Sequence, residues 1–399
     1  MGILRRRTYR HLLGAQLVAL VGTGLATVAL GLLAYDLAGV GAGAVLGGAL
    51  AVKMVANVVV APVAAVLTRR MPRRALLVGL DLVRAAVAAA LPFVTSVWQV
   101  FALVTLLQVA SAAFTPAFQA LIPTVLPDER DYTRALSFSR LAYDLEGIVS
   151  PVLAAALLTV VSFSGLFAGT AFGFLVSAAL VLGVRLPETD RTGSGQVTRG
   201  IRQYLRTPRL RAQLGLNLAA AAAGSMVLVN TVVLVRGDLG LGDTAVAVGL
   251  GAFGAGSMLA ALTLPRVLTG VPDRVVVLTG AGVLGAALFA LAALYATAPA
   301  LPTVLIGWLV LGTAYSLVLT PVGRLIRRSA EERELPALFA AQFALSHAGW
   351  LVTYLLAGAL GAALSPPWTM AALGVVAVGG LAFGARTWTD RPQPVAAGV

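Results

Sequence analysis

The sequence predicts an all-α membrane protein with twelve transmembrane helices in two six-helix bundles, and three observations support this prediction. Apolar residues make up 59% of the 399 residues and charged residues only 11%, against roughly 45–50% and 25% in soluble domains. The mean hydropathy is +0.92, so lipid must be the solvent for most of the surface. Basic residues cluster in every second connection between the apolar runs.

The predicted helices are apolar runs of about the length that spans a bilayer, roughly 20 residues. The first half of the chain contains runs at 11–34, 42–66, 75–95, 99–121, 135–159 and 164–184. The second half contains runs at 212–235, 244–265, 275–296, 302–322, 336–361 and 367–387. Arg5, Arg6 and Arg7 precede the first run, which indicates an uncleaved first helix rather than a signal peptide.

The connections between the runs predict an orientation. The even-numbered connections carry Arg69, Arg70, Arg73, Arg74, Arg130, Arg134, Arg191, Arg199, Arg202, Arg206, Arg209, Arg266, Arg274, Arg324, Arg327, Arg328 and Arg333. The odd-numbered connections carry only Arg236. Because positive residues are retained on the inner side of a membrane, we expect a multi-pass protein of the cytoplasmic membrane with both termini in the cytoplasm.

The long polar stretch at 185–211 predicts the boundary between the two bundles, 1–184 and 212–399. We interpret it as a basic cytoplasmic linker containing a short amphipathic helix that lies on the inner leaflet. An arm that binds nucleic acid is the rival interpretation of its charge. Two comparable halves are the usual construction of secondary transporters, and we expect a monomer in the lipid bilayer that binds no nucleic acid.

Several classes of site are excluded by residue type. The chain has no cysteine and two histidines, so thiolate metal sites, disulfides and His-rich metal sites are excluded. It also lacks the Gly-rich motif with Lys and Ser or Thr that binds nucleotide phosphates. No nucleophile with a base and an acid is visible. We therefore expect neither a cofactor nor an enzyme.

Ionisable side chains inside predicted spans are the first candidates for function, because their burial in lipid is costly. Lys53, with Asn57 one turn further on, lies in the second run. The fifth run carries Arg140, Asp144 and Glu146. Arg140 and Asp144 are four residues apart, so they share a helix face and can pair for structural reasons. Glu146 is about 200° around the helix from Asp144 and points elsewhere.

Glu146 is the better candidate for carrying a proton, since burial favours the neutral form of a carboxyl group. A purely structural hydrogen bond from Tyr143 or to a backbone group is the alternative. Lys53 can pair with Glu146 or with Asp144 across the cavity, or extend its amine toward the membrane surface. These three interpretations remain open at the sequence level.

The eleventh and seventh runs supply further polar candidates. His347 titrates near neutral pH in water, although a lone histidine on an aromatic helix face is more often a packing residue. Together with Asp144 and Glu146 it could instead form a divalent cation site. The remaining candidates for substrate binding or coupling are Gln342, Trp350, Tyr354, Asn217 and Asn230, and the two asparagines can also act as contacts between helices.

The loop after the second run, from Ala61 to Arg84, resembles the loop signature of the major facilitator superfamily, Gly-x-x-x-Asp-Arg-x-Gly-Arg-Arg. The signature matches at Arg70, Arg73 and Arg74, whereas Arg69 stands where the family has Asp. The resemblance implies a gating loop in which that acid pairs with basic groups. We expect Asp81, in an Asp81-Leu-Val-Arg84 segment similar to the family's, to take the role of the missing acid.

Two further segments are similar to exporters of that superfamily. The stretch from Phe114 to Arg130 resembles drug and siderophore exporters, and Gly147-Ile-Val-Ser-Pro151 lies where exporters carry a Gly-Pro motif, with Ser150 in place of the glycine. The segments from Thr320 to Arg328 and from Ala340 to Trp350 resemble members associated with nickel resistance. The resemblance implies alternating access around a site between the bundles.

From these features we predict a secondary transporter that moves a small solute across the cytoplasmic membrane. Proton-coupled efflux of a small organic compound is the leading hypothesis. Export of a divalent metal ion such as nickel or cobalt, with the same fold, is the first alternative. A membrane enzyme or a non-transporting scaffold is the second.

Overall fold

The computed structural model describes most of the chain. The described residues are 6–60, 71–119, 121–126, 128, 131, 135, 138–139, 142, 146, 149–150, 152–184, 196–329 and 334–389. Within these ranges the chain is almost entirely helical and contains no strand. The all-α class predicted from composition is thus confirmed for the described residues.

The first half contributes five long helices to this description. They are α1 (Arg7–Ala38), α2 (Ala42–Val55), α4 (Arg73–Ala90), α5 (Val97–Gln119) and α8 (Phe163–Leu182), with a short α6 (Ile122–Val125) after α5. Gly39, which separates α1 from α2 through the short helix η2 (Gly39–Gly41), has φ of 54°. A left-handed residue at this point lets the chain reverse, and glycine adopts it without steric cost.

The second half contributes six long helices. They are α10 (Pro208–Val232), α11 (Asp243–Gly270), α12 (Asp273–Thr297), α13 (Leu301–Leu319), α15 (Leu335–Ala363) and α16 (Pro366–Thr387), with the short α14 (Val322–Arg327) before α15. Four of them, α10, α13, α15 and α16, have proline in their first two positions. Proline fits there because the first amides of a helix have no acceptor within the helix.

The observed helices agree with the predicted spans. Ten segments of the described residues are long and apolar enough to cross a membrane, and the first of them, Arg7–Val59, is 53 residues long. That segment contains both α1 and α2, so the ten account for eleven of the predicted helices. Ala142, Glu146 and Ser150 of the fifth run are each helical, whereas Leu158 and Thr159 at its end lie in a turn. The count of twelve remains a prediction, because ten residues of that run, among them Arg140 and Asp144, lie outside the described residues.

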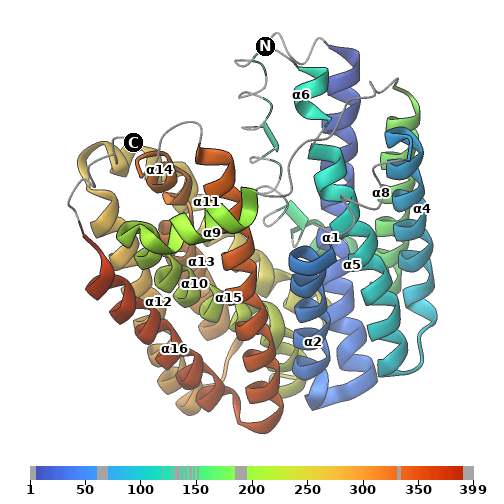
Figure 1. Ribbon diagram of the computed structural model, residues 1–399. Coiled ribbons are helices and arrows are strands. Elements are labelled where there is room, and N and C mark those ends of the chain that lie inside the picture. The colour runs from blue at the N-terminus through green and yellow to red at the C-terminus, as the bar shows by residue number, and fades with distance from the viewer. Residues whose placement is uncertain are drawn as a thin grey trace, which may run out of the picture.

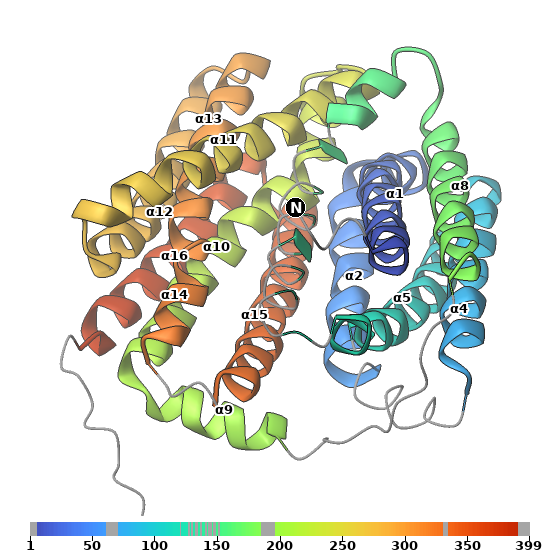
Figure 2. The same cartoon turned by 90° about the horizontal axis from the view of Figure 1, so that it is seen from above.

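The helices form two groups that lie side by side, as Figures 1 and 2 show. In the first group α8 packs on α1 and α4, and α5 packs on α2 and α4; in the second, α16 packs on α10 and α12, and α13 packs on α11 and α12. The main contact between the groups joins α2 to α15. Each group is formed by helices from one half of the chain, and the bundle boundaries 1–184 and 212–399 stay a prediction.

Two of the spanning helices end in a π-helical turn. The turn η3 (Ala56–Val60) continues α2 directly beyond the turn that carries Lys53, and η6 (Val233–Asp238) continues α10. A π-helical turn contains one residue more than an α-helical turn, and such turns are frequent at functional sites. The two turns therefore change the angular positions of the side chains that follow Lys53 and Asn230.

The basic linker contains the helix α9 (Gln196–Arg206), which crosses the end of the second bundle beside α15 (Figure 1). Its apolar side is buried against the protein, where Tyr204 is in one cluster with Leu210, Ile326 and Leu338. Burial raises the pKa of the Tyr204 phenol, so it remains a donor and its hydroxyl donates to Gln342 Oε1. The helix was predicted correctly, but its apolar side faces α15 rather than the lipid.

Candidate functional site

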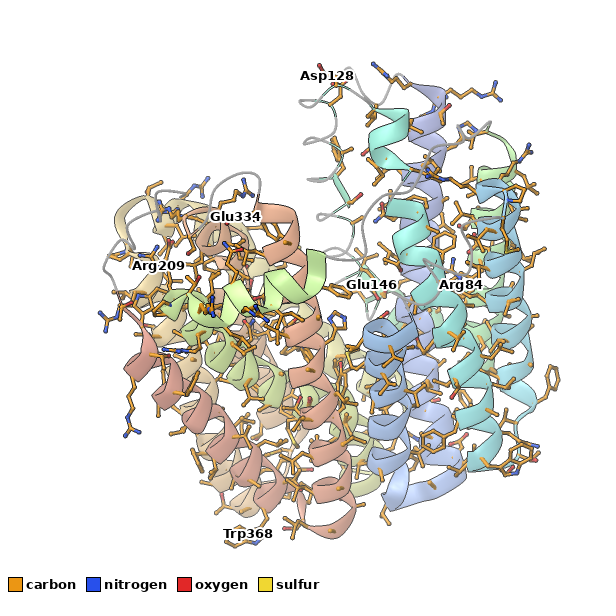
Figure 3. The ribbon with its side chains drawn as sticks, viewed as in Figure 1. Arg84, Asp128, Glu146, Arg209, Glu334 and Trp368 are labelled. Carbon is orange, nitrogen blue, oxygen red and sulfur yellow. The ribbon has the colours of Figure 1, made fainter. Side chains whose placement is uncertain are left out.

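Glu146 lies against α1 and at the boundary between the two bundles, as Figure 3 shows. A Cβ atom at Gly24 of α1 would lie 3.5 Å from Glu146 Cγ and would overlap the side chain of Ser150. The absence of a side chain at Gly24 therefore lets the helix that carries Glu146 and Ser150 approach α1 closely. Ser150, the residue that replaces the exporter glycine, is buried at this contact.

Lys53 is the cation that faces Glu146. Lys53 of α2 lines a pocket with Thr23 of α1, the residue before Gly24, and Gly24 lies against Glu146. Because α2 also packs on α15, the helix that carries His347, the three groups surround one region between α2, α15 and the fifth run. Among the described residues neither Lys53 nor Glu146 has an ion-pair partner within 4.0 Å. The cation and the anion therefore interact across a space and do not form a closed contact. Asp144 and Arg140, the other predicted charges of this run, lie outside the described residues.

A row of aromatic rings from the second bundle borders the same region. Phe253 of α11 lies 5.3 Å from Tyr315 of α13, which lies 6.2 Å from Trp350, and Trp350 lies 4.9 Å from Tyr354, measured between ring centroids. Trp350 and Tyr354 belong to α15, and the backbone of Tyr354 lies against Gly47 of α2, so the row lies where the second bundle meets the first. The site thus combines charges from the first bundle with aromatic surface from the second.

His347 is held by its own helix. Its Nδ1 donates to the carbonyl oxygen of Phe343 at 2.7 Å, and its ring lies 3.9 Å from the Phe343 ring. Only Nε2 remains for another partner. No group of three or more His, Cys, Asp or Glu side chains in the described part of the chain is placed to hold a metal ion. The divalent-metal alternative therefore has no support from the described residues.

The other predicted polar residues do not all gather at this region. Asn217 is buried in the second bundle, where its Oδ1 accepts from Gln213 at 2.9 Å. Asn230 is also buried and donates to the carbonyl oxygen of Ala357 at 3.2 Å. Gln342 accepts from the linker residue Tyr204. Asn57 is half-buried in the π-helical turn after Lys53. Asn230 and Gln342 therefore connect helices, Asn217 bonds within α10, and Asn57 stays near Lys53.

The predicted gating loop is described only from Met71 onward, so Arg69 and Arg70 lie outside the described residues. Arg73 is buried, and Arg74 donates to the carbonyl oxygen of Leu182 at the end of α8.

Asp81 differs from the expectation that it would bind the loop arginines. Its Oδ1 binds Arg84, and its Oδ2 accepts from Ser177 of α8 at 2.8 Å. The Arg84 guanidinium lies 4.0 Å from the Phe114 ring centroid and 4.4 Å from that of Phe174. We call Asp81, Arg84 and Ser177 the buried charge cluster. Asp81 lies seven residues beyond Arg74, about two helical turns into α4. Its apolar surroundings require it to use its nearest cation, Arg84.

The contact between α2 and α15 depends on glycine. A Cβ atom at Gly358 would lie 2.7 Å from the carbonyl oxygen of Gly43, and one at Gly47 would lie 3.2 Å from the Cα atom of Gly358. Neither distance is compatible with a side chain unless the helices move apart. The two bundles therefore touch through backbone at the end of the molecule where α1 and α2 are joined.

Arg236 lies at the same end and joins both bundles. Its Nη1 lies 2.8 Å from Asp36 of α1 and 3.4 Å from Asp243 of α11, and its guanidinium lies 4.8 Å from the Tyr35 ring centroid. We call these four residues the bridging charge cluster. Sequence reasoning did not select it as a site, although Arg236 was the one basic residue that departed from the positive-inside pattern.

Two helical bundles, ten candidate membrane spans and charged groups between the bundles define the class of membrane transporters. The sequence pattern of the Major Facilitator Superfamily matches residues 12–271 of the chain. The chain belongs to this superfamily, and it is a transporter rather than an enzyme.

Known proteins with similar sequences are exporters. The chain is 31% identical over 139 residues to macrolide efflux protein A of Enterococcus faecalis, a match that covers 33% of this chain and 43% of the relative. It is 30% identical over 139 residues to macrolide efflux protein A of Streptococcus pyogenes, covering 33% and 34%. The matched part is thus less than half the length of these relatives.

Solved structures with the same fold are transporters with low sequence identity. A bacterial homologue of the human lysosomal transporter Spinster, in an inward-facing and unoccupied conformation, has a TM-score of 0.73 at 14% identity and covers 96% of this chain and 99% of its own. A POT family transporter in complex with a thioalcohol-conjugated peptide has a TM-score of 0.72 at 12% identity, covering 95% and 97%. These similarities concern the fold alone.

Proposed function

We propose that this transporter exports a small organic compound across the cytoplasmic membrane by alternating access, with protons as the coupling ion and both termini in the cytoplasm. The macrolide efflux relatives support export as the direction. The observation that carries the coupling proposal is the position of Glu146, an ionisable group between the bundles that faces Lys53 without a direct ion pair to a described residue.

A carboxyl group in this position has two ways to be neutralised. It can bind a proton, or it can attract the cation of Lys53, because an isolated charge is costly at this depth of a membrane. A proton that arrives from one side weakens the attraction to Lys53, and its release on the other side restores it. Glu146 is thus the proton carrier of the proposed cycle, and Lys53 is the group that competes with the proton.

The aromatic row supports an organic cargo. Rings such as Trp350 and Tyr315 offer large apolar surface with few fixed hydrogen-bond requirements, which suits a compound larger than a metal ion. A macrolide antibiotic is the first cargo to test, since it is what the named relatives export. The protein functions as a monomer in this proposal, because the two bundles of one chain enclose the site.

The test measures proton-driven uptake of a macrolide into everted membrane vesicles. Glu146→Gln cannot release a proton, so uptake driven by a proton gradient should fall to the level of vesicles without the protein. Exchange of labelled for unlabelled cargo at equal pH on both sides should persist, because it needs no proton release.

Asp128→Asn is the matched control, since Asp128 is an exposed acid away from the site (Figure 3). This variant should transport like the unchanged protein. Proton-dependent uptake by Glu146→Gln at the unchanged rate would contradict the role of Glu146. Uptake by the unchanged protein that does not depend on the proton gradient would contradict coupling itself.

A further inference from the structure

The first bundle contains a pocket that the transport proposal has not used. It lies between α1, α2 and α5, and Leu91 and Phe174 also line it. Its polar lining comes from Thr23, Thr27, Lys53, Gln108 and Ser111. Lys53, the lysine that faces Glu146, is therefore also part of the lining of this pocket.

The polar groups of this pocket fall into two sets. Thr23 and Thr27 donate to carbonyl oxygens of their own helix, those of Ala19 at 2.9 Å and Thr23 at 3.0 Å. The side chains of Lys53, Gln108 and Ser111 are half-buried and have no hydrogen bond or ion pair with a described residue. Three side chains with hydrogen-bond donors thus line one space without a partner among the described residues.

Donors without partners are costly inside a membrane, where water does not replace the missing bonds. The ammonium group of Lys53 has three donors and no acceptor, so its complement is a carbonyl or carboxylate oxygen. The walls around it are apolar and include Leu50, Leu107 and Phe174. A cationic head would be repelled by Lys53, and a fully polar solute would leave these walls uncovered.

We propose that this pocket binds the head of the cargo, and that the cargo is an apolar compound with a carboxylate or carbonyl group that accepts from Lys53. This inference rests on the proposed function, because it specifies the cargo of the same transport site. The body of the cargo extends from the pocket toward the aromatic row. Binding of the head to Lys53 leaves Glu146 without its cation, which favours uptake of a proton by Glu146 in the loaded protein.

The test uses the fact that Lys53 is the one lysine of the chain. Acetic anhydride acetylates accessible amines, and peptide mass spectrometry separates Lys53 from the terminal amine. The probes are a series of arylalkyl carboxylates of increasing chain length, each paired with the alcohol of the same carbon skeleton. We expect the carboxylates that fit to slow acetylation of Lys53 about tenfold, while their alcohols have little effect.

Two variants locate the protection. Ser111→Leu fills the pocket and should abolish protection by the carboxylates while Lys53 stays reactive. Asp128→Asn, an exposed acid away from the site, should leave protection unchanged. Equal protection by each acid and its alcohol would overturn the assignment of the head group. No protection by any acid, or protection that persists in Ser111→Leu, would overturn the pocket.

This measurement needs neither a proton gradient nor transport. Protection of Lys53 without proton-driven uptake would retain the pocket and contradict the coupling proposal. Proton-driven uptake without protection of Lys53 would retain the coupling proposal and contradict the pocket. The two proposals can therefore fail separately.

Discussion

Arg84 and Arg236 both bind aspartate and both lie over aromatic rings, but they join different parts of the molecule. Arg84 is buried, and both its partner Asp81 and Ser177, which donates to Asp81, belong to the first bundle. Arg236 is partly exposed, and its partners Asp36 and Asp243 lie in different bundles. The same pairing of arginine with aspartate therefore stabilises a single bundle at Arg84, and it stabilises the position of one bundle relative to the other at Arg236.

The difference matters for a protein that works by alternating access. Contacts within a bundle persist when the two bundles rotate relative to each other, whereas contacts between bundles must break. A partly exposed ion pair contributes little free energy, so it can be broken in each cycle. The buried charge cluster has no such requirement and can be strong.

The largest effect is expected in the buried charge cluster. Arg84→Met leaves Asp81 as a buried charge without its cation, and loss of one member of such a pair costs about 3–5 kcal/mol of folding stability. We expect a large drop in the thermal unfolding temperature of the purified protein, measured by loss of the monodisperse peak on heating.

The double variant Asp81→Leu with Arg84→Met is the control, because it removes both charges and leaves apolar groups of similar size. It should recover most of the lost stability. If the single and the double variants are equally unstable, packing on Phe114 and Phe174 stabilises the bundle, and not the ion pair.

A smaller effect is expected at the contact between α2 and α15. Gly358→Val introduces a side chain where the backbone of Gly43 lies, and overpacking of this kind costs about 1–3 kcal/mol. The variant should disfavour the conformation in which these helices touch. Gly349→Val, on the same helix but with no atom within 4 Å of the added Cβ, is the matched control.

The measurement uses the absence of cysteine from the chain. A single cysteine in place of Ala44, at the contact, reports access of a maleimide reagent. Its labelling should be faster in Gly358→Val and unchanged in Gly349→Val. Equal labelling in both variants would show that the contact does not control access from this end.

The smallest effect is expected at the bridging charge cluster. Arg236→Gln removes ion pairs that are partly exposed, and such pairs contribute about 0.2–1 kcal/mol, which corresponds to at most about a fivefold change in the ratio of two conformations. Labelling of the same cysteine should rise modestly. Asp36→Asn should have a smaller effect, because Arg236 keeps Asp243.

Salt distinguishes the two charge clusters. Molar sodium chloride should raise labelling in the unchanged protein and have no further effect in Arg236→Gln, because exposed charges are screened and buried ones much less. A response to salt that survives the Arg236→Gln change would assign it to other charges.

The sequence predicted the helices well because hydropathy and length are local properties. The apolar runs match the observed helices to within a few residues at most ends. The cytoplasmic position of both termini, which the positive-inside pattern predicts, stays a prediction. The linker helix α9 was predicted from its pattern of apolar and basic residues. The surface on which α9 packs was not predicted, because the pattern alone does not say whether the apolar side contacts lipid or protein.

The candidate site was predicted less completely. Intramembrane charge was enough to select Lys53 and Glu146, which the structure brings into one region. Polarity within the spans also selected Asn230 and Gln342, which bind other helices, and Asn217, which binds its own. Whether a polar group faces a site, a neighbouring helix or its own helix depends on helix rotation in three dimensions. Gln108 and Ser111, whose side chains have no hydrogen bond with a described residue, carry no charge, so nothing in the sequence distinguished them.

The π-helical turn at Val233–Asp238 has a consequence for insertions and deletions. Arg236 lies inside this turn. The direction of its side chain therefore depends on the one additional residue that a π-helical turn contains compared with an α-helical turn. Deleting one residue between Asn230 and Arg236 would turn the arginine by about 100° around the helix axis, away from Asp36, although every partner would still be present. Deletion of one residue here would thus uncouple the two bundles more completely than most substitutions. This segment should therefore tolerate a change of residue type better than a change of length.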